Sequence, residues 1–281
     1  MKPPRVPPLG LTEHPRRTVL VLEPDFPAWP ETVDGYGFHS AAGWGALREL
    51  ARASPPSAVV LVRAHGGEAE AGELRALIRA TPSIPVVASV DFRQATAGQV
   101  RALLETGLAE IACVGETGGS PRALVPTLRR AHARPLKRRI EERLPVWVPE
   151  DARTLLRAAA ETVVDLGGRE AFAGIFGVYV RTVAEWCREL HLPPPRRLLG
   201  WVRVLLALTL LEEAHRTVLN VALACGYKDN SSLKRALENF SGTPALGSRE
   251  QRFDPAFDRF AAELRALRHD AQGRRPRSPA G

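Results

Sequence analysis

The sequence predicts two domains of different classes: an α/β domain with a parallel sheet, followed by an all-α domain. Over residues 16–133, short apolar runs alternate with amphipathic stretches. Over residues 149–268, the apolar residues instead recur at helical spacing. Two stretches of this second region share a pattern in which an Ala precedes a Gly by four positions. We therefore expect a repeated helical unit in the C-terminal half.

The N-terminal domain is expected to contain four strands, and the residues that form them are apolar runs at 18–22, 58–62, 84–90 and 110–114. The stretches between and after them, near 44–52, 72–80, 99–106 and from about Pro121, have helical spacing. Residues 23–43 show neither pattern and are predicted to be irregular. Buried strands that alternate with helices favour a parallel sheet with helical crossovers.

Three segments lie outside the two domains. Residues 1–15 form a Pro-rich lead and residues 269–281 a basic tail, and both are expected to be unstructured. Residues 134–148, RPLKRRIEERLPVWV, read as a basic, partly helical connector broken by Pro135 and Pro145. A charged helix of this kind is usually a solvated face, but it could also extend the last helix of the N-terminal domain into a dimer seam.

Residues 217–242 predict two short helices that meet at a tight corner. An Ala-rich apolar helix over 218–225 is interrupted by Gly226, and Asp229 or Asn230 can cap the helix that follows. One face of that helix carries the apolar residues Leu233, Leu237 and Phe240. This arrangement is typical of a helix-turn-helix.

The opposite face of the second helix is polar and basic. It contains the candidate DNA contacts Asn230, Ser231, Ser232, Lys234 and Arg235. Amide, hydroxyl and cationic side chains are the groups that bind base edges and phosphates. An ordinary helical hairpin with a solvated polar face is the alternative interpretation.

A second unit precedes this one. Ala173 and Gly177 repeat the spacing of Ala222 and Gly226, and an apolar residue, Val183, follows at the position expected to lock the next helix. A long apolar helix over 196–213 lies between the two units. Two such units can place two helices in successive major grooves, about 34 Å apart.

Residues from about 149 to 252 resemble the DNA-binding domain of the AraC/XylS family of transcription regulators. The resemblance lies in GVYVRTVAEWCRE, LLGWVRVLLALTLLEE and VLNVALACGYKDNSSLKRALENFSGTP. It implies a seven-helix, two-lobed module in which Asn230, Ser231, Lys234 and Arg235 of the second unit face the groove, and Arg181, Thr182, Ala184 and Glu185 do so in the first.

Glu185 departs from the family pattern, which usually has a basic or amide residue there. Because phosphates repel a carboxylate, we expect the first unit to bind DNA weakly or only to cap the second.

The N-terminal domain resembles a response-regulator receiver, a flavodoxin-like fold, in SAVVLV, IPVVASV and LLETGLAEIACV. The resemblance places Val62 where a receiver has its phospho-accepting Asp, Val90 where it has Ser or Thr, and Val114 where it has Lys. Only Glu23 and Asp25 remain of the acidic cluster. Phosphoryl transfer needs a carboxylate nucleophile and a bound Mg²⁺, so we predict a pseudo-receiver without that chemistry.

Composition agrees with a nucleic-acid partner. The 281 residues carry 39 Lys and Arg against 31 Asp and Glu, a net charge of +8, which favours a polyanion. Cys113, Cys187 and Cys225 lack metal-type spacing and are expected to be buried thiols in a reducing cytosol. Trp186 and Trp201 fall at apolar helical positions and are expected in the core. No apolar run approaches the ~18 residues of a membrane span.

These observations together predict a cytoplasmic, sequence-specific DNA-binding transcription regulator with no enzymatic activity, no metal and no cofactor. Double-stranded DNA is the expected partner, with RNA polymerase and a second copy of the chain as further candidates. The alternative is an interaction or adaptor protein that keeps both folds without binding DNA. An enzyme is disfavoured because the sequence offers no nucleophile with an adjacent base.

Overall fold

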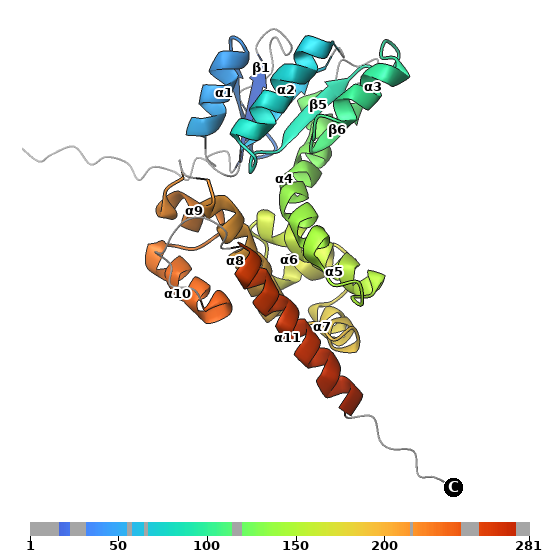
Figure 1. Ribbon diagram of the computed structural model, residues 1–281, viewed down its shortest axis with the longest axis vertical. Coiled ribbons are helices and arrows are strands. Elements are labelled where there is room, and N and C mark those ends of the chain that lie inside the picture. Colours follow the sequence, from blue (N-terminus) through green and yellow to red (C-terminus); the bar gives the residue numbers. More distant parts are fainter. Residues whose placement is uncertain are drawn as a thin grey trace, which may run out of the picture. The chain divides into compact units, whose positions relative to one another are not determined.

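The computed structural model describes residues 17–22, 32–54, 58–64, 67–113, 120–213, 216–242 and 253–273 (Figure 1). The chain divides into two compact units, Met1–Ala131 and His132–Gly281. The predictions at Glu23, Asp25 and Val114, and those for residues 1–15 and 274–281, lie outside the described residues. The prediction of an unstructured tail from residue 269 was wrong for residues 269–273, which belong to a helix that ends at Gly273.

The N-terminal unit contains a six-stranded sheet in its described part, with the order β2-β3-β1-β4-β5-β6. The strands are β1 (Arg17–Leu22), β2 (Thr32–Val33), β3 (Tyr36–Ala41), β4 (Val59–Arg63), β5 (Val86–Val90) and β6 (Glu110–Cys113). All neighbouring pairs are parallel except β2 with β3. The predicted α/β class with a mainly parallel sheet is therefore confirmed.

Strands β2 and β3 lie in the stretch predicted to be irregular, and that prediction was wrong. They form a hairpin around Asp34 and Gly35, which have φ values of 47° and 84°. Asp-Gly is the sequence that a two-residue hairpin turn with positive φ favours. The strand over 36–41 could not be recognised as an apolar run, because it contains the polar, exposed residues His39 and Ser40.

Helices cover both faces of this sheet. On one face α1 (Trp44–Ala53), α2 (Glu68–Ala80) and α3 (Ala97–Leu104) pack against β-strand residues such as Val60 and Val62. On the other face, the first half of α4 (Pro121–Arg143) packs against residues such as Leu61. The buried side chains that these helices supply are Leu47, Leu74, Leu77 and Leu103 on the first face, and Leu124, Val125 and Leu128 on the second.

The predicted break at Pro135 is wrong, because α4 continues through it to Arg143. A proline inside a helix cannot donate to the carbonyl four residues earlier and costs about 3 kcal/mol. Apolar burial offsets this cost: the side chains of the predicted connector at Leu136, Ile140, Leu144 and Val148 lie in the core of the C-terminal unit. The segment 134–148 is thus part of the C-terminal unit, and α4 ends at Arg143, two residues before Pro145.

The described part of the C-terminal unit contains no strands, as predicted. After α4 come α5 (Glu150–Val164), α6 (Arg169–Gly174), α7 (Val180–Glu189), α8 (Pro195–Leu211), α9 (Val218–Ala224), α10 (Asn230–Ser241) and α11 (Phe253–Gly273). Helix α8 is the centre of the unit, with buried residues on nearly all sides. The other helices from α5 to α11 pack around it (Figure 1).

No helix in the part of the chain that the structure describes is both long and apolar enough to cross a lipid bilayer.

Candidate nucleic-acid interface

Helices α9 and α10 form the second of the two predicted helix-turn-helix units. Gly226 between them has φ +77°, which a residue with a side chain adopts only with strain. The backbone N–H of Tyr227 then donates to the carbonyl of Ala222 at 2.9 Å, which closes the end of α9. The glycine is therefore required by the turn, as the sequence indicated.

Asp229 caps α10. Its Oδ1 accepts hydrogen bonds from the backbone N–H of Ser232 at 2.7 Å and from the Ser232 hydroxyl at 2.8 Å. These two bonds lower the pKa of Asp229, so the carboxylate stays charged at the positive end of the helix dipole. Ser232, a predicted DNA contact, is half-buried and its hydroxyl is engaged in this cap.

The inner face of α10 is fixed against α8. Leu233 and Leu237 are buried, and the Phe240 ring meets the Trp201 ring at a centroid distance of 5.2 Å and an angle of 74°. Gly200 of α8 makes room for this ring, because an added Cβ would lie only 2.5 Å from Phe240 Cζ. The three predicted inner-face residues Leu233, Leu237 and Phe240 therefore all contact the rest of the unit.

Helix α11 supports the same contact. The Glu263 carboxylate accepts hydrogen bonds from Trp201 Nε1 at 2.8 Å and from Arg197 Nη2 at 2.7 Å. Burial acts to raise the pKa of Glu263, but the bonds from Arg197 and Trp201 outweigh it and hold the pKa below its usual value. The hydrogen bond to Glu263 of α11 thus orients the Trp201 indole, and the indole ring in turn packs against Phe240 of α10.

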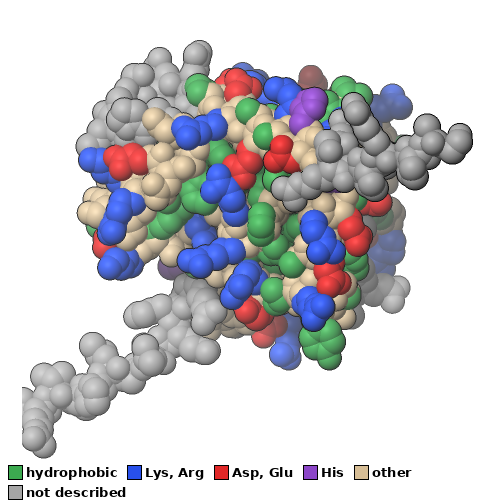
Figure 2. Space-filling view, turned by 90° about the horizontal axis from the view of Figure 1, so that it is seen from below, with side chains coloured by type: hydrophobic (Ala, Val, Ile, Leu, Met, Phe, Trp, Pro, Cys, Tyr) green, Lys and Arg blue, Asp and Glu red, His purple; other side chains and the backbone are tan. Residues whose placement is uncertain are grey.

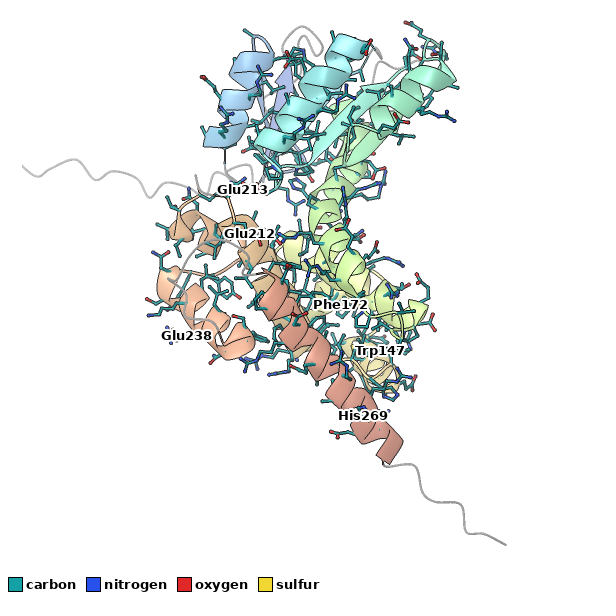
Figure 3. All side chains as sticks on the ribbon, in the orientation of Figure 1. Trp147, Phe172, Glu212, Glu213, Glu238 and His269 are labelled. Atoms are coloured by element: carbon teal, nitrogen blue, oxygen red, sulfur yellow. The ribbon has the colours of Figure 1, made fainter. Side chains whose placement is uncertain are left out.

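The connection into α9 is anchored by two carboxylates at the end of α8. Glu213 accepts a hydrogen bond from Arg216 Nε at 2.6 Å, and both side chains are almost fully buried. Glu212 accepts from two nitrogens of Arg139 on α4, at 2.6 and 3.1 Å (Figure 3). Removing one partner of the buried Glu213–Arg216 pair would leave an uncompensated charge in the protein interior.

The outer face of α10 is exposed and polar. Its exposed side chains are Asn230, Ser231, Lys234, Arg235, Glu238 and Asn239. The Arg235 Nε lies 3.4 Å from the carbonyl oxygen of Ser231, and Lys234 Nζ lies 3.9 Å from Glu238 Oε1. The side of the molecule seen from below carries many Lys and Arg side chains with Asp and Glu between them (Figure 2). The α10 cations are weakly held and able to reach an anionic partner.

The first unit repeats the backbone of the second. Gly177 has φ +66°, and the N–H of Val178 donates to the carbonyl of Ala173 at 3.2 Å, as Tyr227 does to Ala222. Phe172 of α6 lies in the core (Figure 3), and Val183 of α7 is buried as predicted. The chain therefore contains two copies of the same helix–turn–helix geometry.

The two units differ at their second helices. Tyr179 precedes α7 and makes no side-chain cap, whereas Asp229 caps α10. Counted from these two cap positions, Ala184 and Glu185 occupy the places of Lys234 and Arg235. Each place in α7 thus holds a neutral or acidic residue where α10 has a cation.

The first-unit candidates are less available than those on α10. Arg181 is 90% exposed, but its Nε lies 3.1 Å from Glu185 Oε1 in an ion pair one helical turn away. Thr182 is half-buried. The α7 face therefore carries a neutralised pair instead of a free cation at this point.

Two exposed cations beside these faces were not predicted. Lys228 lies in the turn before α10 with its side chain 78% exposed, and Arg188 lies exposed in the last turn of α7. Arg188 continues the row of Arg181 and Glu185 at helical spacing, so the periodicity of the exposed face would have indicated it.

Two receiver positions in the N-terminal unit are described, and both are apolar and buried. Val62 is fully buried in the core between the sheet and α1–α3, and Val90 lies in the same core. Nearby, Asp91 accepts hydrogen bonds from the side chain and backbone N–H of Arg93, which lower its pKa. Within the described residues, no group of three or more His, Cys, Asp or Glu is placed to hold a metal.

Cys187 and Cys225 are buried free thiols, as the sequence indicated. Burial raises the pKa of each to about 12, so both are protonated at neutral pH and unreactive.

Comparison with known proteins places a helix-turn-helix domain in the same region. Residues 172–251 match a family model described as a helix-turn-helix domain, a stretch that contains both glycine turns together with α7, α9 and α10. The match supports a DNA-binding domain of the AraC type and, with it, a DNA-binding regulator. No curated protein and no solved structure shows a significant match to the chain.

Proposed function

We propose that this protein is a sequence-specific transcription regulator that inserts α10 into the major groove of double-stranded DNA. The observation that carries the proposal is the two-sided character of α10. Its inner face is held by Leu233, Leu237 and Phe240, while Asn230, Ser231, Lys234 and Arg235 lie exposed on the other side. A rigidly held helix with amide, hydroxyl and guanidinium groups outward has the chemistry of base-edge and phosphate recognition.

The second unit supplies most of the DNA affinity. Affinity for the phosphate backbone grows with the number of phosphates that cations neutralise. On α10, Arg235 is exposed and Lys234 lies 3.9 Å from Glu238, whereas on α7 the Arg181 guanidinium lies 3.1 Å from Glu185 in a closer ion pair. The first unit therefore docks weakly, through Arg181, Thr182 and Arg188, and mainly supports the second.

The N-terminal unit serves as a phosphorylation-independent sensory or interaction domain. Without the two-residue β2, the strand order becomes β3-β1-β4-β5-β6, which in chain order reads 2-1-3-4-5. This is the strand order of flavodoxin-like folds and supports the pseudo-receiver interpretation. The isopropyl side chain of Val62 cannot accept a phosphoryl group. A ligand, a second copy of the chain or RNA polymerase would then provide the regulatory contact, in the cytoplasm.

An adaptor that keeps both folds without binding DNA is the second candidate, because the Arg181–Glu185 and Lys234–Glu238 pairs both reduce the charge offered to phosphates. A gel-shift titration of the full-length protein against genomic DNA fragments at two salt concentrations separates the two. A regulator gives saturable binding that weakens with salt and selects particular fragments. Unselective binding contradicts the proposed sequence specificity, and the absence of saturable binding at low salt favours the adaptor.

A further inference from the structure

The C-terminal unit has a pocket of about 330 Å³ beside α7, on residues that the proposed DNA contacts do not include. We call it the α5–α7 pocket. Its lining comes from α5, from the turn after α6 and from α7 with its cap, and consists of Asp151, Thr154, Leu155, Phe176, Trp186, Glu189 and Leu190. This volume is at the lower end of the range for small-molecule sites, about 300–1,000 Å³.

Two aromatic rings form part of its wall. Phe176 and Trp186 meet edge to face, with centroids 5.7 Å apart and planes at 90°. Both residues are half-buried, and both line the pocket. The face of an aromatic ring carries negative potential and attracts cations, most strongly for Trp.

The charged residues of the lining are all acidic. Asp151 and Glu189 are exposed, and neither is in an ion pair with another described residue. Glu189 is also the last residue of α7, where the helix dipole contributes further negative potential. Both charged residues that line the pocket are thus carboxylates, in a chain with a net charge of +8.

The arginines of α5 do not neutralise the pocket. Arg157 is paired with Glu141 and Glu150. Arg153 donates to the carbonyls of Val148 and Pro145, at 3.1 and 3.0 Å. The hydrogen bonds of both arginines therefore go to groups other than Asp151 and Glu189, which leaves these two carboxylates able to accept a ligand.

We propose that the α5–α7 pocket binds a small organic cation, an alkylammonium or quaternary ammonium compound. The ring faces of Trp186 and Phe176 contact its alkyl groups and its charge, and the carboxylates of Asp151 and Glu189 balance that charge. The proposal does not depend on DNA binding. Since Trp186 and Glu189 belong to α7, the ligand would act on the first helix-turn-helix unit.

The test compares two probes of equal shape on the full-length protein: choline and its neutral carbon isostere 3,3-dimethylbutan-1-ol. Binding is followed by NMR through the indole N–H signal of Trp186, assigned with Trp186→Phe. Choline is expected to shift this signal saturably at millimolar concentrations. The isostere, which lacks only the charge, is expected to bind at least about fivefold more weakly.

Variants identify the source of the charge selectivity. Asp151→Asn combined with Glu189→Gln is expected to weaken choline binding by about fivefold or more, whereas the exposed Glu170→Gln of α6 leaves it unchanged. Circular dichroism checks that the variants fold, and the comparison of choline with its isostere on the unaltered protein decides the question if they do not. The absence of a saturable shift, equal binding of the two probes, or an equal effect of Glu170→Gln would overturn the proposal.

Discussion

Gly200→Ala tests whether the contact between α8 and Phe240 sets the position of α10. The added Cβ would lie 2.5 Å from Phe240 Cζ, and 3.1 and 3.3 Å from its two ε carbons. Carbon atoms pack favourably at about 3.5–4.0 Å, so the ring must move by about 1 Å. Trp201 on one side, at a centroid distance of 5.2 Å, restricts where the ring can go.

The stability change combines two opposing effects. Overpacking a core contact costs about 1–3 kcal/mol, while Ala in place of Gly within a helix gains about 0.8–1 kcal/mol. We therefore expect a net loss of about 0–2 kcal/mol in the free energy of unfolding, measured by urea denaturation. Gly174→Ala is the matched control, since a Cβ there meets nothing within 4 Å and keeps only the gain.

The larger effect is expected in DNA binding. Phe240 lies in the last turn of α10, so a ring that moves by about 1 Å shifts the helix that carries Arg235. Loss of one good base contact costs about 1–3 kcal/mol, which corresponds to at least about a fivefold weaker affinity in fluorescence anisotropy. Phe240→Leu in the Gly200→Ala background should restore part of the binding. If Gly200→Ala matches Gly174→Ala in both stability and affinity, the contact does not position α10.

Three further outcomes are expected. Arg235→Ala should weaken binding to a selected DNA fragment by about 1–3 kcal/mol, and Arg181→Ala should weaken it by less. Glu185→Arg should tighten binding and make its salt dependence steeper. Equal losses of affinity for the two alanine variants would mean that both units dock alike. Acetyl phosphate should leave the intact mass unchanged, and a gain of one phosphoryl group on Asp25 or Asp91 would contradict the pseudo-receiver interpretation. A fragment of residues 132–281 should fold alone as a helical domain, with a higher melting temperature than a fragment of residues 149–281. The shorter fragment lacks the buried side chains of α4, which contribute about 1.5–3 kcal/mol each. Equal melting temperatures would refute the placement of the second half of α4 in the core of the C-terminal unit.

Local patterns in the sequence predicted the regular elements well. The apolar runs predicted four strands of the parallel sheet, and residue types alone predicted the Gly226 corner with a helix cap at Asp229 or Asn230, of which the structure has Asp229. These features depend on neighbours within a few positions, where backbone preferences and side-chain spacing decide the structure. The β2–β3 hairpin carried such a signal in Asp34-Gly35 and could have been predicted from it.

Features that depend on distant residues could not be predicted in this way. Pro135 signals a helix break locally, yet α4 continues because Leu136 and Ile140 are buried by helices much later in the chain. The ion pair between Arg181 and Glu185 could have been predicted from the sequence, since the two residues are four positions apart on a helix. The engagement of Ser232 in the cap could not be predicted, because the same hydroxyl on an exposed helix face could bind DNA instead.

Helix α11 shows how the exposed face of α10 depends on residues outside the matched region. The family match ends at residue 251, yet Phe253, Phe257 and Phe260 of α11 are buried in the same core as α8. The polar contact of Glu263 with Trp201 then links α11 to the ring that supports Phe240. The residues proposed to face DNA lie within the matched region, but the helix that carries them is held in part by this last helix. A truncation after residue 251 should therefore impair DNA binding without removing a single proposed DNA contact.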